Sequence, residues 1–290
     1  SSDIRVELDN PSQYQQTYTF GKNIPNLWVA GGEGTNTLAK STDGINWTGL
    51  GTSIFSVKCN GISWNGNLWV AVGNGTNTIA SSPDGISWTG RGSNIFTYGF
   101  SIDWNGTLWV AVGSGTNTIA TSLDGINWSG RGSNILDIGY SIVWNGSLWV
   151  GVGTTIFTTN TSNTIAISPD GINWTGLGTS IFTDFGRGIA WNGSLWIAVG
   201  WGSNSIATSP DGIIWSGLGT TIFTTQGNGI AWNGNLWVAV GWGSNSIATS
   251  PDGMIWTGLG TTIFSTQGTS ITWNGSLWVA VGAETNTIAT

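Results

Sequence analysis

The chain has no histidine and only one cysteine, Cys59, among its 290 residues. Without histidine, the Ser/His/Asp and Cys/His arrangements of nucleophilic enzymes are excluded, and zinc sites lose their commonest ligand. A single cysteine cannot form a disulfide within the chain, so the cysteine content does not indicate a redox compartment. We therefore expect no metal ion and no cofactor.

Charged residues are also scarce. They make up 7% of the chain, against about 25% in a typical soluble domain, and the formal net charge is −7. There is no basic cluster, which argues against nucleic acid or an anionic membrane as a partner. No apolar run approaches the ~18 residues of a membrane span, so we expect no membrane insertion. The low charge and low lysine content favour an extracellular or virion surface.

Tryptophan is abundant, and 19 of the 21 tryptophans fall into three recurring motifs. The motifs are W-N-G, L-W followed by Val or Ile, and D-G-x-x-W, exemplified by Trp64, Trp69 and Trp88. The L-W tryptophans recur at intervals of 41, 40, 40, 47, 41 and 41 residues. We number the resulting repeats 1 to 7 by these residues, which are Trp28, Trp69, Trp109, Trp149, Trp196, Trp237 and Trp278. A period of about 40 residues is typical of a propeller or a solenoid.

Each repeat contains four short apolar or alternating runs separated by turn signals, which indicates four strands. Asn65-Gly66 is predicted to form a two-residue type I′ turn, and Asp84-Gly85 a similar turn between the third and fourth strands. No stretch shows the 3.6-residue apolar period of a helix. We therefore predict an all-β fold, a seven-bladed β-propeller of four-stranded antiparallel blades, as a single domain over residues 1–290. The predicted blades are about 16–49, 60–90, 100–130, 140–176, 187–217, 228–258, and 269–290 together with 3–8.

The two ends of the chain suggest how the ring closes. Repeat 7 stops after its third predicted strand, and residues 3–8 form an alternating segment outside the repeats. We predict that residues 3–8 supply the outer strand of the last blade, so that no sheet edge is left open. The alternative is that they form an unpaired leader.

The S-x-D-G-x-x-W motif resembles the Asp-box (BNR) repeats of sialidases, some xyloglucan hydrolases and photosystem II assembly-factor propellers. The resemblance covers six of the seven repeats, although one residue fewer separates Asp from Trp than in the usual motif. It implies that the aspartates are structural staples. An Asp side chain in a turn accepts backbone N–H bonds of its own hairpin, which agrees with that role. The six aspartates are Asp43, Asp84, Asp124, Asp170, Asp211 and Asp252.

An enzyme would need acids outside the Asp boxes. The two carboxylates of a glycosidase lie roughly 5–9.5 Å apart, and Asp137 with Asp184, in consecutive links between blades, is the one plausible pair. Sialidase-like activity would need an arginine triad, whereas Arg91 and Arg131 occupy the same slot in adjacent repeats. We therefore predict no catalytic residues.

Variation among the repeats is concentrated on one predicted face, which carries the loops between the second and third strands and the links between blades. Binding residues are expected on such loops. Two tryptophans outside the three motifs lie there and are expected to be exposed, and the links nearby carry amide and tyrosine side chains. We predict that these residues bind ligand: Trp201, Trp242, Gln226, Asn228, Gln267, Tyr98 and Tyr140.

A flat aromatic ring beside neutral hydrogen-bonding groups suits a sugar, and two such sites would gain avidity on a multivalent surface. We therefore predict a non-enzymatic, lectin-like module for neutral glycans. The alternative is a structural or protein-interaction module, such as a virion or cell-surface component, and a glycosidase is less favoured. Because repeats 5 and 6 differ at only 8 of 41 positions, duplication alone also explains their shared Trp and Gln. The sequence does not indicate an oligomeric state.

Overall fold

The computed structural model describes residues 27–44, 46–155, 163–273, 275–283 and 288–290. Within these residues the secondary structure is antiparallel β-strand and turn, without helix, so no helix there could cross a membrane. The predicted closing strand, residues 3–8, and the predicted start of repeat 1, residues 16–26, lie outside the described residues. The chain separates into two compact units, Ser1–Arg131 and Gly132–Thr290.

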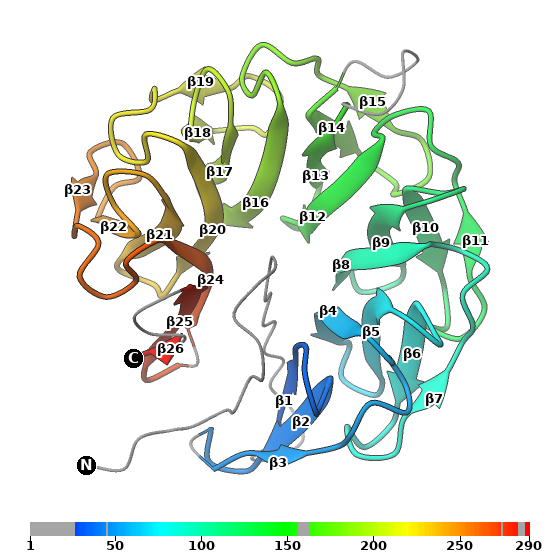
Figure 1. The fold of residues 1–290 in the computed structure, drawn as a ribbon. Helices are drawn as coiled ribbons and strands as arrows, with labels where there is room; N and C mark the ends of the chain where they lie inside the picture. Colours follow the sequence, from blue (N-terminus) through cyan, green and yellow to red (C-terminus); the bar gives the residue numbers. More distant parts are fainter. Residues whose placement is uncertain (1–26, 45, 156–162, 274, 284–287) are drawn as a thin grey trace. The chain divides into compact units, whose positions relative to one another are not determined.

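The first unit contains three antiparallel sheets, one for each of repeats 1 to 3 (Figure 1). Repeat 1 forms a three-stranded sheet in the described residues, and repeats 2 and 3 form four-stranded sheets in chain order. The strands are β1(Trp28–Gly31), β2(Leu38–Ser41), β3(Thr48–Gly49), β4(Lys58–Trp64), β5(Trp69–Asn74), β6(Ile79–Ser82), β7(Thr89–Gly90), β8(Tyr98–Trp104), β9(Trp109–Ser114), β10(Ile119–Ser122) and β11(Ser129–Gly130).

The second unit repeats the same pattern four times (Figure 1). Repeats 4 to 6 are four-stranded, and repeat 7 shows three strands in the described residues. The strands are β12(Ile138–Trp144), β13(Trp149–Thr154), β14(Ile165–Ser168), β15(Thr175–Gly176), β16(Phe185–Trp191), β17(Trp196–Trp201), β18(Ile206–Ser209), β19(Ser216–Gly217), β20(Gln226–Trp232), β21(Trp237–Trp242), β22(Ile247–Ser250), β23(Thr257–Gly258), β24(Gln267–Trp273), β25(Trp278–Ala283) and β26(Ile288–Ala289).

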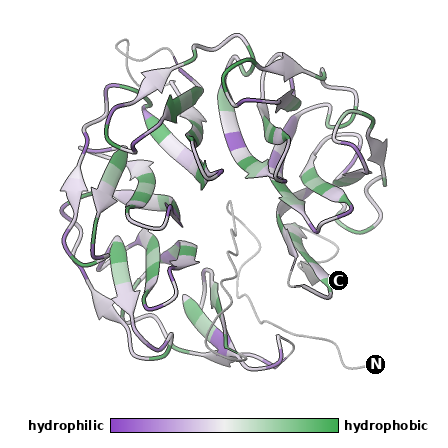
Figure 2. Cartoon of the chain, turned by 180° about the vertical axis from the view of Figure 1, so that it is seen from behind, coloured by the Kyte–Doolittle hydropathy of each residue, from purple (hydrophilic) through white to green (hydrophobic). Residues whose placement is uncertain are grey.

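The apolar cores of each unit lie between successive sheets. One core joins Leu27 and Val29 of repeat 1 to Ile62 and Trp69 of repeat 2, and each later pair of repeats within a unit has an equivalent core. The second strands of repeats 2 to 6 are buried along almost their whole length, which explains why each is an almost continuous apolar run instead of an alternating one. The apolar bands on the strands are visible as green segments in Figure 2.

The three tryptophan motifs occupy three different environments. The L-W tryptophans of repeats 2 to 6 are completely buried. The W-N-G tryptophans are half-buried and pack beside them, as Trp64 does beside Trp69 with 5.0 Å between ring centroids. The D-G-x-x-W tryptophans are also half-buried, and the Trp88 indole N–H donates to the carbonyl of Gly85 (3.1 Å). Only the L-W tryptophans of those five repeats are therefore wholly core residues.

The W-N-G turn differs from the prediction by one residue. The ladder ends at the pair Trp64–Trp69, and the Asn65 N–H donates to the carbonyl of Leu68 (3.2 Å). Gly66, with φ of +102°, and Asn67 are therefore the two central residues. The Asn65 side chain accepts the N–H groups of Asn67 (2.9 Å) and Leu68 (2.8 Å). Sequence reasoning placed Asn65 in the centre because Asn-Gly is a common turn pair, but here the Asn side chain closes the turn.

A second side-chain staple, which was not predicted from the sequence, ties each of repeats 2 to 6 to the link before it. In repeat 2 the Asn77 amide donates to the carbonyl of Ile54 (2.8 Å) and accepts the N–H of Gly92 (3.1 Å). Asn163, Asn204 and Asn245 make the same two bonds in repeats 4 to 6. The signal in the sequence is an Asn that follows Thr or Ser at the same position of every repeat.

The first strands of repeats 2 to 7 begin two residues earlier than the predicted blade boundaries, for example at Lys58 instead of residue 60. A β-bulge at the third residue of each strand is the reason. In β4 the register shifts between Cys59 and Gly61, so that Asn60 has no partner in the ladder. The extra residue interrupts the alternating pattern from which the strand was predicted.

Candidate ligand-binding site

The predicted site residues of the second unit lie at strand ends or at the bulge near a strand start and not in loops, which corrects the sequence interpretation. Trp201 is the last residue of β17, and Trp242 is the last residue of β21. Phe185 pairs with Trp201, Trp201 with Gln226, Gln226 with Trp242, and Trp242 with Gln267. These five residues therefore form one row across repeats 5, 6 and 7, which we call the Trp-Gln row.

Both tryptophans of the row are partly exposed, as 42% of the Trp201 surface and 44% of the Trp242 surface remain accessible. Trp201 is supported from behind by Phe185, which is buried, with ring centroids 5.2 Å apart. Each tryptophan is followed by a glycine with positive φ, Gly202 at +118° and Gly243 at +125°. The chain turns away directly after each ring, so that one surface of the ring is left accessible.

The three predicted amide residues lie beside the tryptophans and bond to one another. Gln226 donates through Nε2 to Asn228 Oδ1 (2.7 Å). Asn228 donates through Nδ2 to the carbonyl of Gly268 (2.7 Å) and to Gln267 Oε1 (3.3 Å). The amides thus form a fixed chain from repeat 6 to repeat 7. In this arrangement Gln226 Oε1 at one end and Gln267 Nε2 at the other keep capacity to accept and to donate a hydrogen bond.

Asn228 stands at the β-bulge of its strand, and the bulge re-aims its side chain. The register shifts between Gly227 and Gly229, which leaves Asn228 outside the ladder. The equivalent residues of the second unit are Tyr140, Arg187 and Thr269. The bulge therefore places one variable side chain per repeat next to the row.

Tyr140 belongs to a cation–π cluster at the start of the row. The Arg187 guanidinium lies 4.7 Å from the centre of the Tyr140 ring and 4.5 Å from that of Phe185. Burial raises the pKa of the Tyr140 hydroxyl, and the nearby Arg187 charge partly opposes the rise. Because Phe185 also contacts Trp201, the cluster is continuous with the row. Phe185 and Arg187 are not among the site residues predicted from the sequence, although they occupy the positions that Gln226 and Asn228 occupy in repeat 6.

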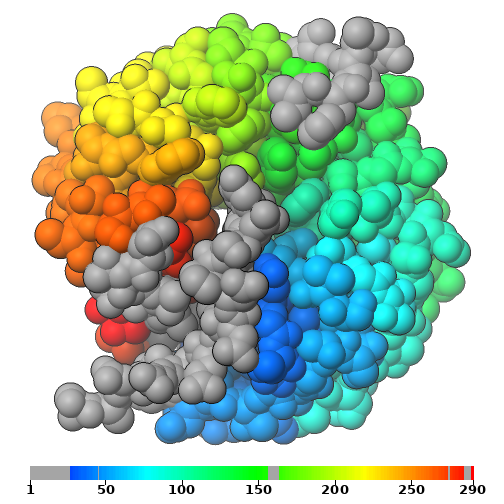
Figure 3. All heavy atoms as spheres, viewed as in Figure 1, coloured from blue at the N-terminus to red at the C-terminus, as the bar shows by residue number. Residues whose placement is uncertain are grey.

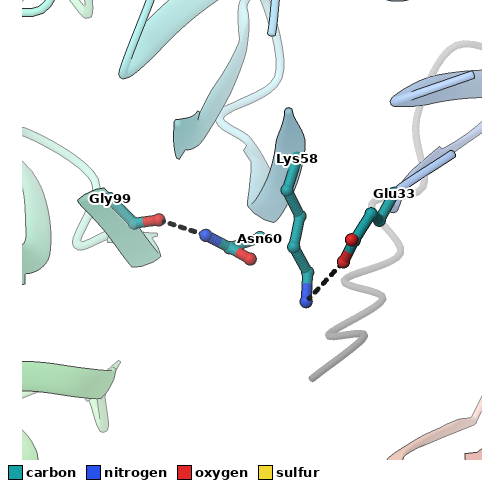
Figure 4. A network of polar contacts seen from close by, with 4 residues as sticks. All are labelled: Glu33, Lys58, Asn60 and Gly99. Atoms are coloured by element: carbon teal, nitrogen blue, oxygen red, sulfur yellow. Dashed lines mark hydrogen bonds and ion pairs between the residues drawn. The ribbon is translucent and has the colours of Figure 1, made fainter. Parts of the chain in front are cut away.

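Tyr98 lies in the first unit and is not part of the Trp-Gln row. It is exposed and stacks on Phe100 with 6.4 Å between ring centroids. In the preceding repeat the buried Lys58 reaches Glu33 (3.7 Å), and Asn60 donates to the carbonyl of Gly99 (2.8 Å), as Figure 4 shows. Asn60 thus makes the same inter-repeat bond as Asn228 does in the second unit.

The aspartates of the S-x-D-G-x-x-W motif form a second set of turns at the other end of the sheets. Asp84 Oδ1 accepts the N–H groups of Ile86 (2.8 Å) and Ser87 (2.7 Å), and it also accepts the Ser82 hydroxyl (2.9 Å). The Ser82 Oγ in turn accepts the N–H of Gly85 (2.8 Å). This turn has five residues between Ser82 and Trp88, so the prediction of a two-residue turn is wrong.

The same bonds hold these carboxylates in the ionised form. The backbone N–H of Ser87 is the main cause that lowers the pKa of Asp84 to about 2. Equivalent bonds lower the pKa of Asp124, Asp170, Asp211 and Asp252. Each carboxylate accepts bonds within its own turn, which is the geometry that a staple requires.

The acids considered for catalysis lie beside Thr154. The Asp137 N–H donates to the carbonyl of Thr154 (2.8 Å), and the Thr154 hydroxyl donates to the carbonyl of Asp184 (3.0 Å). The Asp184 carboxylate accepts the Thr183 hydroxyl (3.0 Å). Residues 156–162, part of the insertion in repeat 4, lie outside the described residues. In the part of the chain that the structure describes, no group of three His, Cys, Asp or Glu residues could hold a metal ion.

Comparison with known proteins shows the fold. No known sequence family matches the chain, and no curated protein matches it. A streptogramin B lyase structure has 13% identity and a TM-score of 0.77, with 97% of this chain and 94% of that chain covered. An inactive virginiamycin B lyase from Staphylococcus aureus with quinupristin has 14% identity and a TM-score of 0.74, with 96% of each chain covered. YCF48 bound to D1 peptide has 16% identity and a TM-score of 0.65, again with 96% of each chain covered. The fold is therefore all-β and propeller-like, and proteins that share it include both enzymes and a peptide-bound protein.

Proposed function

We propose that the chain is a seven-bladed β-propeller whose D-G-x-x-W turns are Asp-box staples. Seven sequence repeats and the uniform strand order within each unit support this architecture. An L-W leucine lies under the Asp-box glycine of the next repeat, as Leu27 does under Gly85 and Leu195 under Gly253. In a closed ring, residues 3–8 would complete blade 7.

We propose further that the protein is a non-enzymatic, lectin-like module that binds neutral glycans at the Trp-Gln row. The observation that carries this proposal is the pairing of two half-exposed tryptophans with a fixed chain of amides. Sugar C–H faces pack on flat aromatic rings, whereas hydroxyls need donors and acceptors at defined positions. The ends of the amide chain offer one acceptor, Gln226 Oε1, between the two rings and one donor, Gln267 Nε2, on the far side of Trp242.

The Trp-Gln row favours one continuous site over the two separate sites expected from the sequence. Gln226 lies between Trp201 and Trp242 and pairs with both. Adjacent strands lie ~4.8 Å apart, so the two rings, two strand steps apart, are separated by roughly 10 Å. That distance suits two sugars of one oligosaccharide better than two independent chains. Arrays of such rows on a multivalent surface would add avidity.

A peptide-binding surface is the second candidate function. YCF48, which has the same fold, is described as bound to D1 peptide, and an extended peptide could also use exposed tryptophans and amides. A structural or protein-interaction module of this kind would suit a cell surface or virion, and an extracellular or virion location is part of both proposals. The lyases with this fold give an enzyme some support, but the chain has no histidine for a Ser/His/Asp or Cys/His nucleophile system.

A glycan array probed with the intact protein tests the proposal, followed by titration of the strongest hit. Trp201→Ala and Trp242→Ala should each weaken binding, and the double variant should abolish it. Asp211→Ala is the matched control, because it should lower the melting temperature and leave the affinity unchanged. An array without hits would reject the lectin and leave the peptide-binding candidate in front. Loss of binding in Asp211→Ala at unchanged stability would reverse the assignment of site and staple.

A further inference from the structure

The Asp-box turns of repeats 5 and 6 expose large apolar side chains. Ile213 and Ile214 are 52% and 71% exposed, and Met254 and Ile255 are 53% and 74% exposed. We call these four residues the apolar turn patch. Scattered single apolar residues are normal on a surface, but a contiguous exposed group is informative.

Ile214 and Ile255 stand where other repeats have residues that stabilise the turn. In repeats 1, 3 and 4 the position of Ile214 and Ile255 is Asn, and its amide donates to the second carboxylate oxygen of the Asp box at 2.7–2.8 Å. In repeat 2 it is Ser87, whose side chain also bonds to its aspartate. Isoleucine cannot make this bond, and most of its surface remains in water. Within the turn, the replacement therefore brings no visible gain in stability.

The two turns lie next to each other. The Thr208 hydroxyl of repeat 5 contacts the sulfur of Met254 in repeat 6 (3.7 Å). Thr208 pairs with Ser216, two residues after Ile214. On the face that Figure 3 shows, the atoms of repeats 5 and 6, yellow to orange, adjoin one another. The Thr208–Met254 contact thus brings the turn of repeat 6 against the third strand of repeat 5, where the turn of repeat 5 begins.

The charges around the patch indicate what covers it. Asp211 and Asp252 lie inside it, and both are exposed carboxylates. No lysine or arginine follows Arg187 in the sequence. A second copy that docked patch to patch would bring four carboxylates together, and an anionic membrane would repel them. A complementary surface combines apolar side chains with positive charge.

We propose that the apolar turn patch docks a protein segment in which apolar side chains are flanked by Lys or Arg. This site is independent of the glycan proposal. Ser209, where the Asp-box turn begins, pairs with Trp196 at the opposite end of β17 from Trp201. A strand of six residues spans about 17 Å. The two sites therefore lie at opposite ends of the sheet.

Fluorescence anisotropy with a labelled peptide of alternating Leu and Lys residues tests the proposal. A Leu/Glu peptide controls for charge and a Ser/Lys peptide for apolar contact. The wild-type protein should bind the Leu/Lys peptide best. The double variant Ile214→Asn with Ile255→Asn should weaken that binding roughly tenfold or more, since it removes the two most exposed apolar side chains of the patch. It should fold normally, because repeats 1, 3 and 4 carry Asn at this position.

Ile172→Asn is the matched control variant, because Ile172 is an exposed isoleucine on the same turn of repeat 4. It should leave binding unchanged. Equal binding of the Leu/Lys and Leu/Glu peptides, or equal loss in the control variant, would overturn the proposal. Sedimentation that shows self-association of the wild-type protein but not of the double variant would also overturn it. So would binding to vesicles of phosphatidylserine and phosphatidylcholine that the double variant loses to the same degree as it loses peptide binding.

Discussion

Strand β21 carries a tryptophan at each end, and truncation of the two should have unequal costs. Trp237 is completely buried, whereas Trp242 keeps 44% of its surface exposed. Burial of ~200 Å² at ~25 cal/mol per Å² contributes about 5 kcal/mol before entropy and unfolded-state corrections. Large-to-small changes of buried aromatics cost about 3–5 kcal/mol. We expect Trp237→Ala to fall in that range.

The buried indole N–H of Trp237 places the stability cost of Trp237→Ala at the lower end of that range. Its indole N–H is buried, and none of the described residues accepts a hydrogen bond from it. A buried donor without a partner costs about 1–3 kcal/mol, and truncation removes that penalty together with the ring. For Trp242 a little more than half of the surface is covered, which gives about 3 kcal/mol as an upper limit. We therefore expect Trp242→Ala to cost about 1–2 kcal/mol.

Urea unfolding and thermal melting of the two variants test this difference. A loss of 1 kcal/mol lowers the melting temperature by about 2–4 °C in proteins of nearly this size. Trp237→Ala should therefore melt several degrees below Trp242→Ala, and only the latter should change glycan affinity. Equal melting temperatures would refute the reasoning, because they would mean that Trp242 packs as fully as Trp237. Alanine already occupies the equivalent position of repeat 7 at Ala283, so the change is compatible with the fold.

Three further predictions concern the turns. Gly253→Ala should destabilise the protein by about 1–3 kcal/mol in thermal melts, because φ is +78° and a Cβ would lie 2.7 Å from the Leu195 side chain; an unchanged melting temperature would contradict this close packing. Asn245→Ala should cost about 1–3 kcal/mol and speed exchange of the Gly260 amide, since two hydrogen bonds are lost; Asn245→Asp, which keeps the acceptor, should protect that amide better. The lowered pKa of Asp84, about 2, means that its stabilising effect is complete above the usual pKa of 3.8 and disappears as the pH falls towards 2. The difference in melting temperature between the wild-type protein and Asp84→Asn should therefore be constant above about pH 4 and shrink below it; a difference independent of pH down to 2 would exclude the shift.

The repeats, the all-β class and the antiparallel strands could be predicted from the sequence because they depend on local signals. Motif spacing, turn residues and short apolar runs are encoded within about 40 residues. The positions of the Asp-box aspartates in turns follow from the same signals. The seven-blade count and the closing strand remain predictions, and residues 3–8 lie outside the described residues.

The Trp-Gln row could be predicted only in part. Trp201 and Trp242 were recognised because they fall outside the repeated motifs, and the amides because they vary between repeats. Their joint placement depends on β-bulges and on pairing between the end of one second strand and the start of the next first strand. Such pairing joins residues about 25 positions apart in the sequence, and a bulge hides the strand start from any alternating pattern.

By itself, the sequence determined the period, the four strands of repeats 2 to 6 and the residues that vary. The tertiary structure alone decided that Phe185 supports Trp201, that Gln226 lies between two tryptophans and that Ile214 and Ile255 face water. The physical reason is that exposure and cross-repeat contact depend on how sheets pack against one another. Local propensity specifies each strand and turn, but the surface that a side chain shares with the next repeat exists only after the repeats have packed.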